Sequence, residues 1–144
     1  MRTQTVAAPG GELVITEADF DRLNHLVESP RYRATHATLL APLKDGLGRG
    51  RVVAPREVPK DVVTMNSAVQ VKDLSNGATE TYMLVYPDEA AIDQGKLSVL
   101  APLGAALLGS RVGQVVRFEA PRGVRRLKVL KVLYQPEAAG DFHL

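Results

Sequence analysis

The sequence has 144 residues with no cysteine and no tryptophan, and its only aromatic residues are three phenylalanines and four tyrosines. The absence of cysteine excludes disulfides, thiolate metal sites and cysteine nucleophiles. The three histidines, His25, His36 and His143, form no i, i+4 pair, so a zinc-binding helix is also excluded. We therefore expect neither a metal nor a cofactor.

Long apolar runs are also missing. The most apolar stretch, from Leu97 to Leu108, is interrupted by Ser98, Pro102 and Gly104. It stays well below the ~20 residues that a membrane span needs. The first ten residues lack the continuous apolar core of a secretory signal. We expect a cytoplasmic protein with no membrane partner.

The charged residues are distributed unevenly, although the net charge is only +2. Residues 12–28 contain five acids and one arginine, whereas residues 111–131 contain seven bases and one acid. Such an asymmetry could form a nucleic-acid site or attract a charged partner electrostatically. Aromatic residues that stack on bases are scarce, so we interpret these charges as lying on solvent-exposed faces of two elements. We expect no direct sequence-specific binding of nucleic acid.

The first third of the chain has the pattern of two helices. Thr16 is a candidate cap, Phe20, Leu23 and Val27 follow at helical spacing, and Pro30 ends the first helix. The second apolar series is Leu39, Leu40, Leu43 and Leu47, weakened as a helix by Pro42 and nearby glycines. We expect a short antiparallel hairpin resembling a coiled coil. Its tip is formed by Glu28, Ser29, Pro30, Arg31 and Tyr32.

After a linker at residues 53–59, short β-branched runs replace the helical period. Asn76-Gly77 predicts a β-hairpin between strands at residues 68–74 and 79–86. A second hairpin is expected from residues 114–118 and 124–134, and Pro102 and Gly109 bound a short helix. The prediction is an α+β protein with a helical hairpin at 1–54 and a sheet domain at 59–144.

No constellation of residues supports catalysis. Gly46 to Gly50 follows no strand and lacks the Gly-Lys-Ser/Thr ending of a phosphate loop. No G-x-S-x-G elbow is present, and the serines have no recognisable His or Asp relay. The acids at Glu17, Asp19 and Asp21 crowd a helix N-terminus, where the macrodipole favours them. We expect that the protein is not an enzyme.

The segment Pro102 to Gly113, PLGAALLGSRVG, resembles the S-P-x-x-x-A-L-L-G-x-x-x-G-D segment of the Gre transcript-cleavage factors. Residues 61–67, 84–87, 97–99 and 134–142 extend the resemblance, and they are most similar to a bacterial branch of the family named for regulation of nucleoside diphosphate kinase. The match begins at about Pro59. It implies an FKBP-like C-terminal domain, a twisted antiparallel sheet with one short helix.

The resemblance also implies a function and a partner. An FKBP-like Gre domain docks at the rim of the secondary channel of RNA polymerase, and its docking loop matches Leu100, Ala101 and Pro102. The polar pair of the family is replaced here by Leu100-Ala101, so an apolar contact would have to substitute. Leu100 and Pro102 have an equally good explanation as closure of the core around the helix.

The tip of the hairpin separates this chain from the cleavage factors. Those factors carry a pair of acids on a much longer coiled coil, whereas this tip offers Glu28 alone beside Arg31 and Arg33. One carboxylate flanked by cations is a poor set of ligands for Mg²⁺. We expect competition with Gre factors without stimulated cleavage, and an indirect link to the kinase.

An alternative function, from another class, is an FKBP-like prolyl isomerase or peptide-binding module. Such a pocket is lined by aromatic side chains, and the sequence has few of them. The deficit argues against the alternative without excluding it.

Overall fold

The computed structural model of the chain describes residues 13–35 and 37–141. Two of the three histidines, His36 and His143, lie outside the described residues. So do residues 1–10, which we compared with a secretory signal above. The same is true of Glu12, the first acid of the acidic segment. In the described part, no helix is long and apolar enough to cross a membrane.

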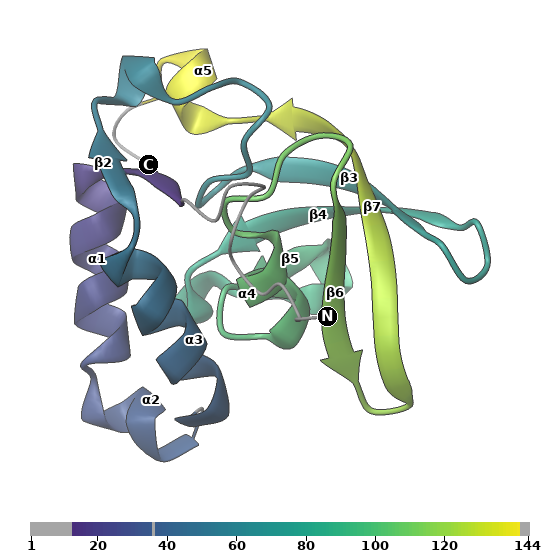
Figure 1. The fold of residues 1–144 in the computed structure, drawn as a ribbon, viewed down its shortest axis with the longest axis horizontal. Helices are drawn as coiled ribbons and strands as arrows, with labels where there is room; N and C mark the ends of the chain where they lie inside the picture. Colours follow the sequence, from purple (N-terminus) through teal and green to yellow (C-terminus); the bar gives the residue numbers. More distant parts are fainter. Residues whose placement is uncertain (1–12, 36, 142–144) are drawn as a thin grey trace.

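The N-terminal region is a helical hairpin joined at its base by a small sheet (Figure 1). It consists, in order, of β1 (Val14–Thr16), α1 (Glu17–Val27), α2 (Pro30–Thr35), α3 (Ala37–Gly48) and β2 (Arg51–Val53). The strands β1 and β2 pair in parallel. Helices α1 and α3 run side by side in opposite directions, and α2 lies at the far end. Both predicted helices are present, but the tip contains a third.

The local sequence explains these helices. The Thr16 hydroxyl oxygen accepts a hydrogen bond from the backbone N–H of Asp19 at 3.3 Å, which confirms the predicted cap. Leu23 and Val27 of α1 are buried, as are Leu40, Leu43 and Leu47 of α3. With 11 and 12 residues, these helices are too short for the three or four heptads of a coiled coil, so that expectation is not supported.

The second region is a five-stranded sheet with strand order β5-β4-β3-β7-β6. Its elements are β3 (Ala68–Asp73), β4 (Thr79–Val85), β5 (Lys96–Ser98), α4 (Pro102–Leu107), β6 (Val115–Ala120), β7 (Gly123–Tyr134) and α5 (Pro136–Ala139), with single 3-10 turns at Pro55–Glu57, Pro87–Glu89 and Ile92–Gln94. The edge strand β5 pairs with β4 in parallel. The expectation of an antiparallel sheet is therefore wrong, because the chain returns to the edge through a crossover and not a hairpin.

Both predicted β-hairpins are confirmed. The β3–β4 pairing places Lys72 opposite Thr79 across the Asn76-Gly77 turn, where Gly77 has a φ of 75°. The β6–β7 pairing ends with Ala120 opposite Gly123. Gly109 follows α4 with a φ of 81°, in agreement with a glycine that ends this short helix.

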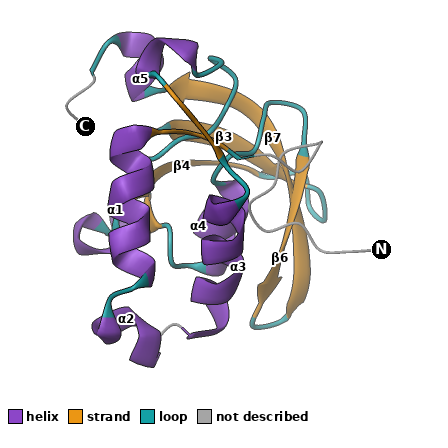
Figure 2. Ribbon diagram, turned by 60° about the vertical axis from the view of Figure 1, so that its left-hand side comes forward, coloured by secondary structure: helices purple, strands orange, loops and turns teal. Residues whose placement is uncertain are grey.

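One continuous hydrophobic core joins the two regions. It contains Leu23 and Leu43 from the helical hairpin together with Leu84, Leu107 and Leu127 from the sheet region. Figure 2 shows α1, α3 and α4 on one side of the sheet. The division of the chain into units 1–54 and 59–144 stays a prediction, and the shared core shows that the two parts are not independent in packing.

Candidate functional site

The expected docking segment lies at the start of α4. Leu100 is buried at 2% exposure, Ala101 is partly exposed, and Pro102 is exposed at the first position of the helix. The backbone N–H of Leu100 donates to the Ser98 hydroxyl at 3.0 Å, which fixes the turn before the helix. The Leu100 side chain therefore belongs to the core, and of the three residues Ala101 and Pro102 have surface exposed to solvent.

Helix α4 sits unusually close to the backbone that leads into it. A Cβ added to Gly104 would lie 2.0 Å from the carbonyl oxygen of Ser98, so only glycine fits. Ala105, Ala106, Leu107 and Leu108 are all buried. Helix α4 therefore packs closely against the chain that precedes it, which holds residues 100–102 in place.

The hairpin tip is built around an ion pair. The Lys44 ammonium of α3 lies 2.8 Å from a carboxylate oxygen of Glu28, just after α1, and more than half of each side chain is exposed. The hydrogen bond from Lys44, together with its charge, lowers the pKa of Glu28 below its ordinary range. Arg31 lies over the ring of Tyr32 at 5.2 Å. Pro30 begins α2, and the Ser29 N–H donates to the Leu26 carbonyl.

This arrangement makes the tip a poor place for a divalent cation. Glu28 is its only acid, and its carboxylate already accepts from Lys44. Among residues 13–35 and 37–141, no three His, Asp or Glu side chains are grouped as they would be to hold a metal ion. The tip presents a closed ion pair and exposed arginines in place of two converging carboxylates.

A polar contact joins the hairpin to the sheet region. Asp19 of α1 is 3% exposed and accepts a hydrogen bond at 3.0 Å from the hydroxyl of Tyr86, which follows β4. Burial raises the pKa of Asp19 to about 6, an effect that the Tyr86 hydrogen bond partly offsets. Burial also raises the pKa of Tyr86, and Arg22 lies 5.4 Å from the centroid of its ring.

This contact corrects one expectation. Asp19 was placed among solvated acids at a helix N-terminus, whereas its side chain is buried against Tyr86. Sequence patterns offer little to reveal such a pair, because an acid three residues after a cap is ordinary and its partner is 67 positions away. Asp21, by contrast, is exposed and belongs to the surface charge of the hairpin.

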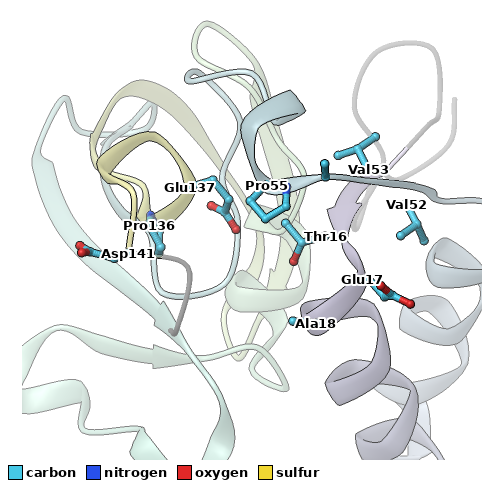
Figure 3. A pocket seen from close by; sticks show the side chains of 10 residues that line it. Thr16, Glu17, Ala18, Val52, Val53, Pro55, Pro136, Glu137 and Asp141 are labelled. Atoms are coloured by element: carbon cyan, nitrogen blue, oxygen red, sulfur yellow. The ribbon is translucent and has the colours of Figure 1, made fainter.

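A cavity of about 640 Å³ lies between the base of the hairpin and α5 (Figure 3). Its acids are Glu17, Glu137 and Asp141, and its walls include Thr16, Pro55 and Pro136. Glu137 accepts a hydrogen bond from the Thr64 hydroxyl at 2.8 Å, and Asp141 accepts one from the Tyr134 hydroxyl. Two of the three carboxylates therefore accept hydrogen bonds from other parts of the chain.

A second cavity of about 510 Å³ lies further along α1 toward the tip, beside the loop that follows β4. Arg22, Arg31, Tyr32 and Tyr86 contribute guanidinium groups and rings to its wall. Asp88 and Glu89 line it as well, so acids and bases are both present. Both cavities are therefore spaces between the hairpin and the rest of the chain.

The comparisons with known proteins agree with one another. A family model described as "Transcription elongation factor, GreA/GreB, C-term" matches residues 58–134. A "Regulator of nucleoside diphosphate kinase" from Escherichia coli K12 is 44% identical over 133 residues, 92% of this chain and 96% of that protein. A GreA from Syntrophotalea carbinolica is 34% identical over 92 residues, 64% of this chain and 58% of that protein.

A solved structure extends the similarity to the fold. A GreA/GreB-type elongation factor from Nitrosomonas europaea aligns with a TM-score of 0.72 and 35% identity, covering 85% of this chain and 98% of that one. The expectation of an FKBP-like domain is wrong: the fold is the Gre type, a curled mixed sheet with a helical hairpin. The prolyl isomerase alternative loses its basis with it.

Proposed function

The chain belongs to the GreA/GreB family of transcription elongation factors, and we propose that it regulates transcription by binding RNA polymerase at the rim of the secondary channel. In this proposal the sheet region docks on the rim and the helical hairpin points into the channel. The hairpin occupies that space without stimulating cleavage of the transcript. The protein then acts by competing with the Gre factors that do stimulate it.

The observation that carries the proposal is the state of the hairpin tip. Glu28 is its single acid, and its carboxylate is paired with Lys44 at 2.8 Å. Since α1 has 11 residues, it spans only about 16 Å. A second metal ion needs one or two free carboxylates in near-octahedral geometry. A short hairpin whose one carboxylate is already paired supports a role in occupying the channel. It argues against metal-assisted cleavage of the transcript.

The docking contact is proposed at Ala101 and Pro102. Both are held at the start of α4, and Pro102 is exposed there without a structural reason beyond opening the helix. The buried Leu100 supports their position from below. An apolar contact of this kind replaces the polar contact implied by the resemblance to the family.

The test is a cleavage assay with core RNA polymerase and a Gre factor. Adding this protein should reduce the stimulated cleavage, and raising the Gre factor should restore it, because two ligands of one site follow mass action. A pull-down with the polymerase at low salt should retain the protein. Failure to bind there, or cleavage stimulated by this protein alone, contradicts the proposal.

A point variant tests the contact while leaving the fold intact. Pro102→Glu places a charge on the docking surface at a helix position that tolerates an acid. We expect weaker binding to polymerase and unchanged thermal stability. Pro87→Glu, at the first position of a 3-10 turn away from α4, is the matched control. Equal binding by both variants would remove the docking role of Pro102.

Removing the whole hairpin is a less suitable test. Leu13, Ile15, Leu23 and Leu43 belong to the same core as the sheet residues, so a chain that starts near residue 54 would expose that core. A full-length chain with substitutions keeps loss of binding separable from loss of folding.

The link to nucleoside diphosphate kinase, suggested by the name of the Escherichia coli relative, is proposed to be indirect and to act through transcription. Purified kinase should show the same activity with and without this protein. A change in that activity in the absence of polymerase would establish a direct effect.

A further inference from the structure

The sheet has one face that carries a concentration of positive charge. On the inner face of β7, Leu127 and Val129 are buried, while Arg126 and Lys128 between and beside them are exposed. The register of the neighbouring strands extends this outer set. We call it the basic face, and it consists of Lys72, Arg117, Arg126, Lys128 and Lys131.

The pairing register places these five cations next to one another. Lys128 lies directly opposite Lys72 of β3, and Arg126 lies directly opposite Arg117 of β6. Lys131 faces Gln70 in the same β3–β7 pair. With strands about 4.8 Å apart and a rise of about 3.3 Å per residue, the basic face is a strip of about 17 by 10 Å.

Such an arrangement is unfavourable for folding alone. Like charges directly opposite each other across a sheet destabilise the pairing. Two such pairs stand side by side here, Lys72 with Lys128 and Arg117 with Arg126. Where local rules of stability are broken in this way, a binding function is the usual compensation.

Within the described residues, no carboxylate lies within 4.0 Å of any charged group of the basic face, although other cations of the chain do have partners. Arg125, which points to the inner side of the same strand, pairs with Asp73 and lies over the ring of Phe118. Arg111 lies 3.5 Å from Asp61. The Nε atom of Arg117 has no hydrogen-bond partner in the described part. The cations of the basic face remain uncompensated.

Acids are nearly absent from this face. The four strands β3, β4, β6 and β7 contain three acids, Asp73, Glu80 and Glu119. Asp73 and Glu80 share the inner side, since their register partners are Leu127 and Val71. Only Glu119, beyond Arg117 at the end of β6, lies on the outer side. The net charge of the outer side is therefore strongly positive.

We propose that the basic face binds the phosphate backbone of duplex DNA without reading its sequence. Lysine is depleted in the cores of protein–protein interfaces, which favour aromatic anchors. The positions that separate the cations carry Gln70, Thr79, Thr81 and Val115, none of them aromatic. Lysine and arginine with small polar neighbours are instead the side chains that neutralise phosphates.

The same composition favours a duplex over a single strand. Proteins that hold single strands stack bases on aromatic rings, and the basic face offers none between its cations. A duplex carries one charge per about 1.7 Å of its axis, so a rigid strip of this length meets several phosphates at once. Because α4 contacts β5 and β6 from the helical side of the sheet, the basic face leaves the proposed polymerase contact free.

The test measures binding of the full-length protein to a fluorescent 20-base-pair duplex of arbitrary sequence by anisotropy. We expect a Kd in the range of about 1–100 μM at physiological ionic strength and the same Kd for an unrelated sequence. Affinity should fall steeply with salt. Lys72→Gln with Lys128→Gln should weaken binding about tenfold and reduce the slope of log K against log salt by about 2.

The matched control is Arg56→Gln with Lys60→Gln, which removes two exposed charges away from the basic face. It should keep the affinity at physiological ionic strength within about twofold of the unsubstituted protein, since charges much farther from the duplex than the Debye length of about 8 Å are largely screened. The Lys72 and Lys128 variant relieves a like-charge pair, so it should fold at least as stably as the original.

Several results would overturn the proposal. They are absence of duplex binding at low salt, equal loss in the control, or tighter binding to a single strand than to the duplex. A fourth is loss of polymerase binding in the Lys72 and Lys128 variant with duplex binding unchanged. That result would assign the basic face to an acidic protein surface.

Discussion

In the helical hairpin two acids are paired with cations of the same chain, whereas the outer face of the sheet leaves five cations without a carboxylate in the described part. Glu28 binds Lys44, and Asp45 binds Arg49. Lys72 and Lys128 lie directly opposite each other in neighbouring strands. The acid at the hairpin tip is thus neutralised by a neighbouring lysine, whereas the five cations on the sheet have no carboxylate partner in the described part.

This difference indicates which surfaces of the protein can bind a charged partner. The single carboxylate at the hairpin tip is already paired with Lys44, so it offers little to a metal ion. We expect the hairpin to contribute to partner binding through its shape and length. Cations on a sheet face that lack carboxylate partners can instead bind the negative charges of a polyanion. The position of both depends on the packing within the sheet region and on the junction that holds the hairpin and the sheet together.

The largest effect is expected at Gly104. Replacing it with alanine would bring a Cβ to 2.0 Å from the Ser98 carbonyl oxygen and force α4 away from the backbone that leads into it. We expect Gly104→Ala to lower the free energy of unfolding by about 3 kcal/mol, measured by chemical denaturation. Gly48→Ala is the control, since nothing lies within 4 Å of its added Cβ. Equal stability of both variants would show that α4 can shift freely.

A second effect concerns the buried acid at the junction. Because burial raises the pKa of Asp19 to about 6, the folded protein holds this proton more tightly than the unfolded chain, whose value is near 4. The contribution of Asp19 to the unfolding free energy is therefore largest below pH 4. It is lost as the pH rises through about 6, by about 3 kcal/mol in total.

The variant Asp19→Asn should lose this pH dependence, because the amide oxygen still accepts from Tyr86 and carries no charge. Denaturation between pH 4 and 8 should show the variant gaining stability relative to the original protein as the pH rises. Asp21→Asn, exposed on the same helix, is the control and should keep the original profile. Identical profiles for Asp19→Asn and the original would contradict the role of this carboxyl.

The sequence was sufficient for elements governed by local patterns. Thr16 capped a helix, Asn76-Gly77 closed a hairpin, and Pro102 opened α4. Each of these depends on neighbours within a few residues, which a sequence displays directly. The short helix α2 at the hairpin tip was missed because Pro30 was interpreted only as a stop, although proline is equally suited to the first turn of a new helix.

The remaining features depend on contacts between distant residues. The parallel pairing of β4 with β5 requires a crossover that no short-range signal specifies. Asp19 meets Tyr86 only after the hairpin has packed on the sheet. The ion pair of Glu28 with Lys44 likewise joins two helices, so a sequence could count the acids at the tip but not show that the only one is engaged.

The smallest expected effect is at that ion pair. In Lys44→Gln the hydrogen bond and the charge that lower the pKa of Glu28 are both removed, so its pKa should rise toward the ordinary range, with Arg33 leaving a small residual effect. A pH titration of the Glu28 carboxyl followed by NMR measures this change. Stability should hardly respond, because pairs between exposed side chains contribute little.

The control for this titration is Arg49→Gln, which breaks the neighbouring pair with Asp45 and should leave Glu28 unchanged. An unchanged Glu28 in Lys44→Gln would mean that the tip is not closed by this contact. If the titration shifts as expected, the freed carboxylate is still a single ligand between arginines. Lys44→Gln should then compete with Gre factors as before and still stimulate no cleavage, because a second carboxylate is missing and not merely masked.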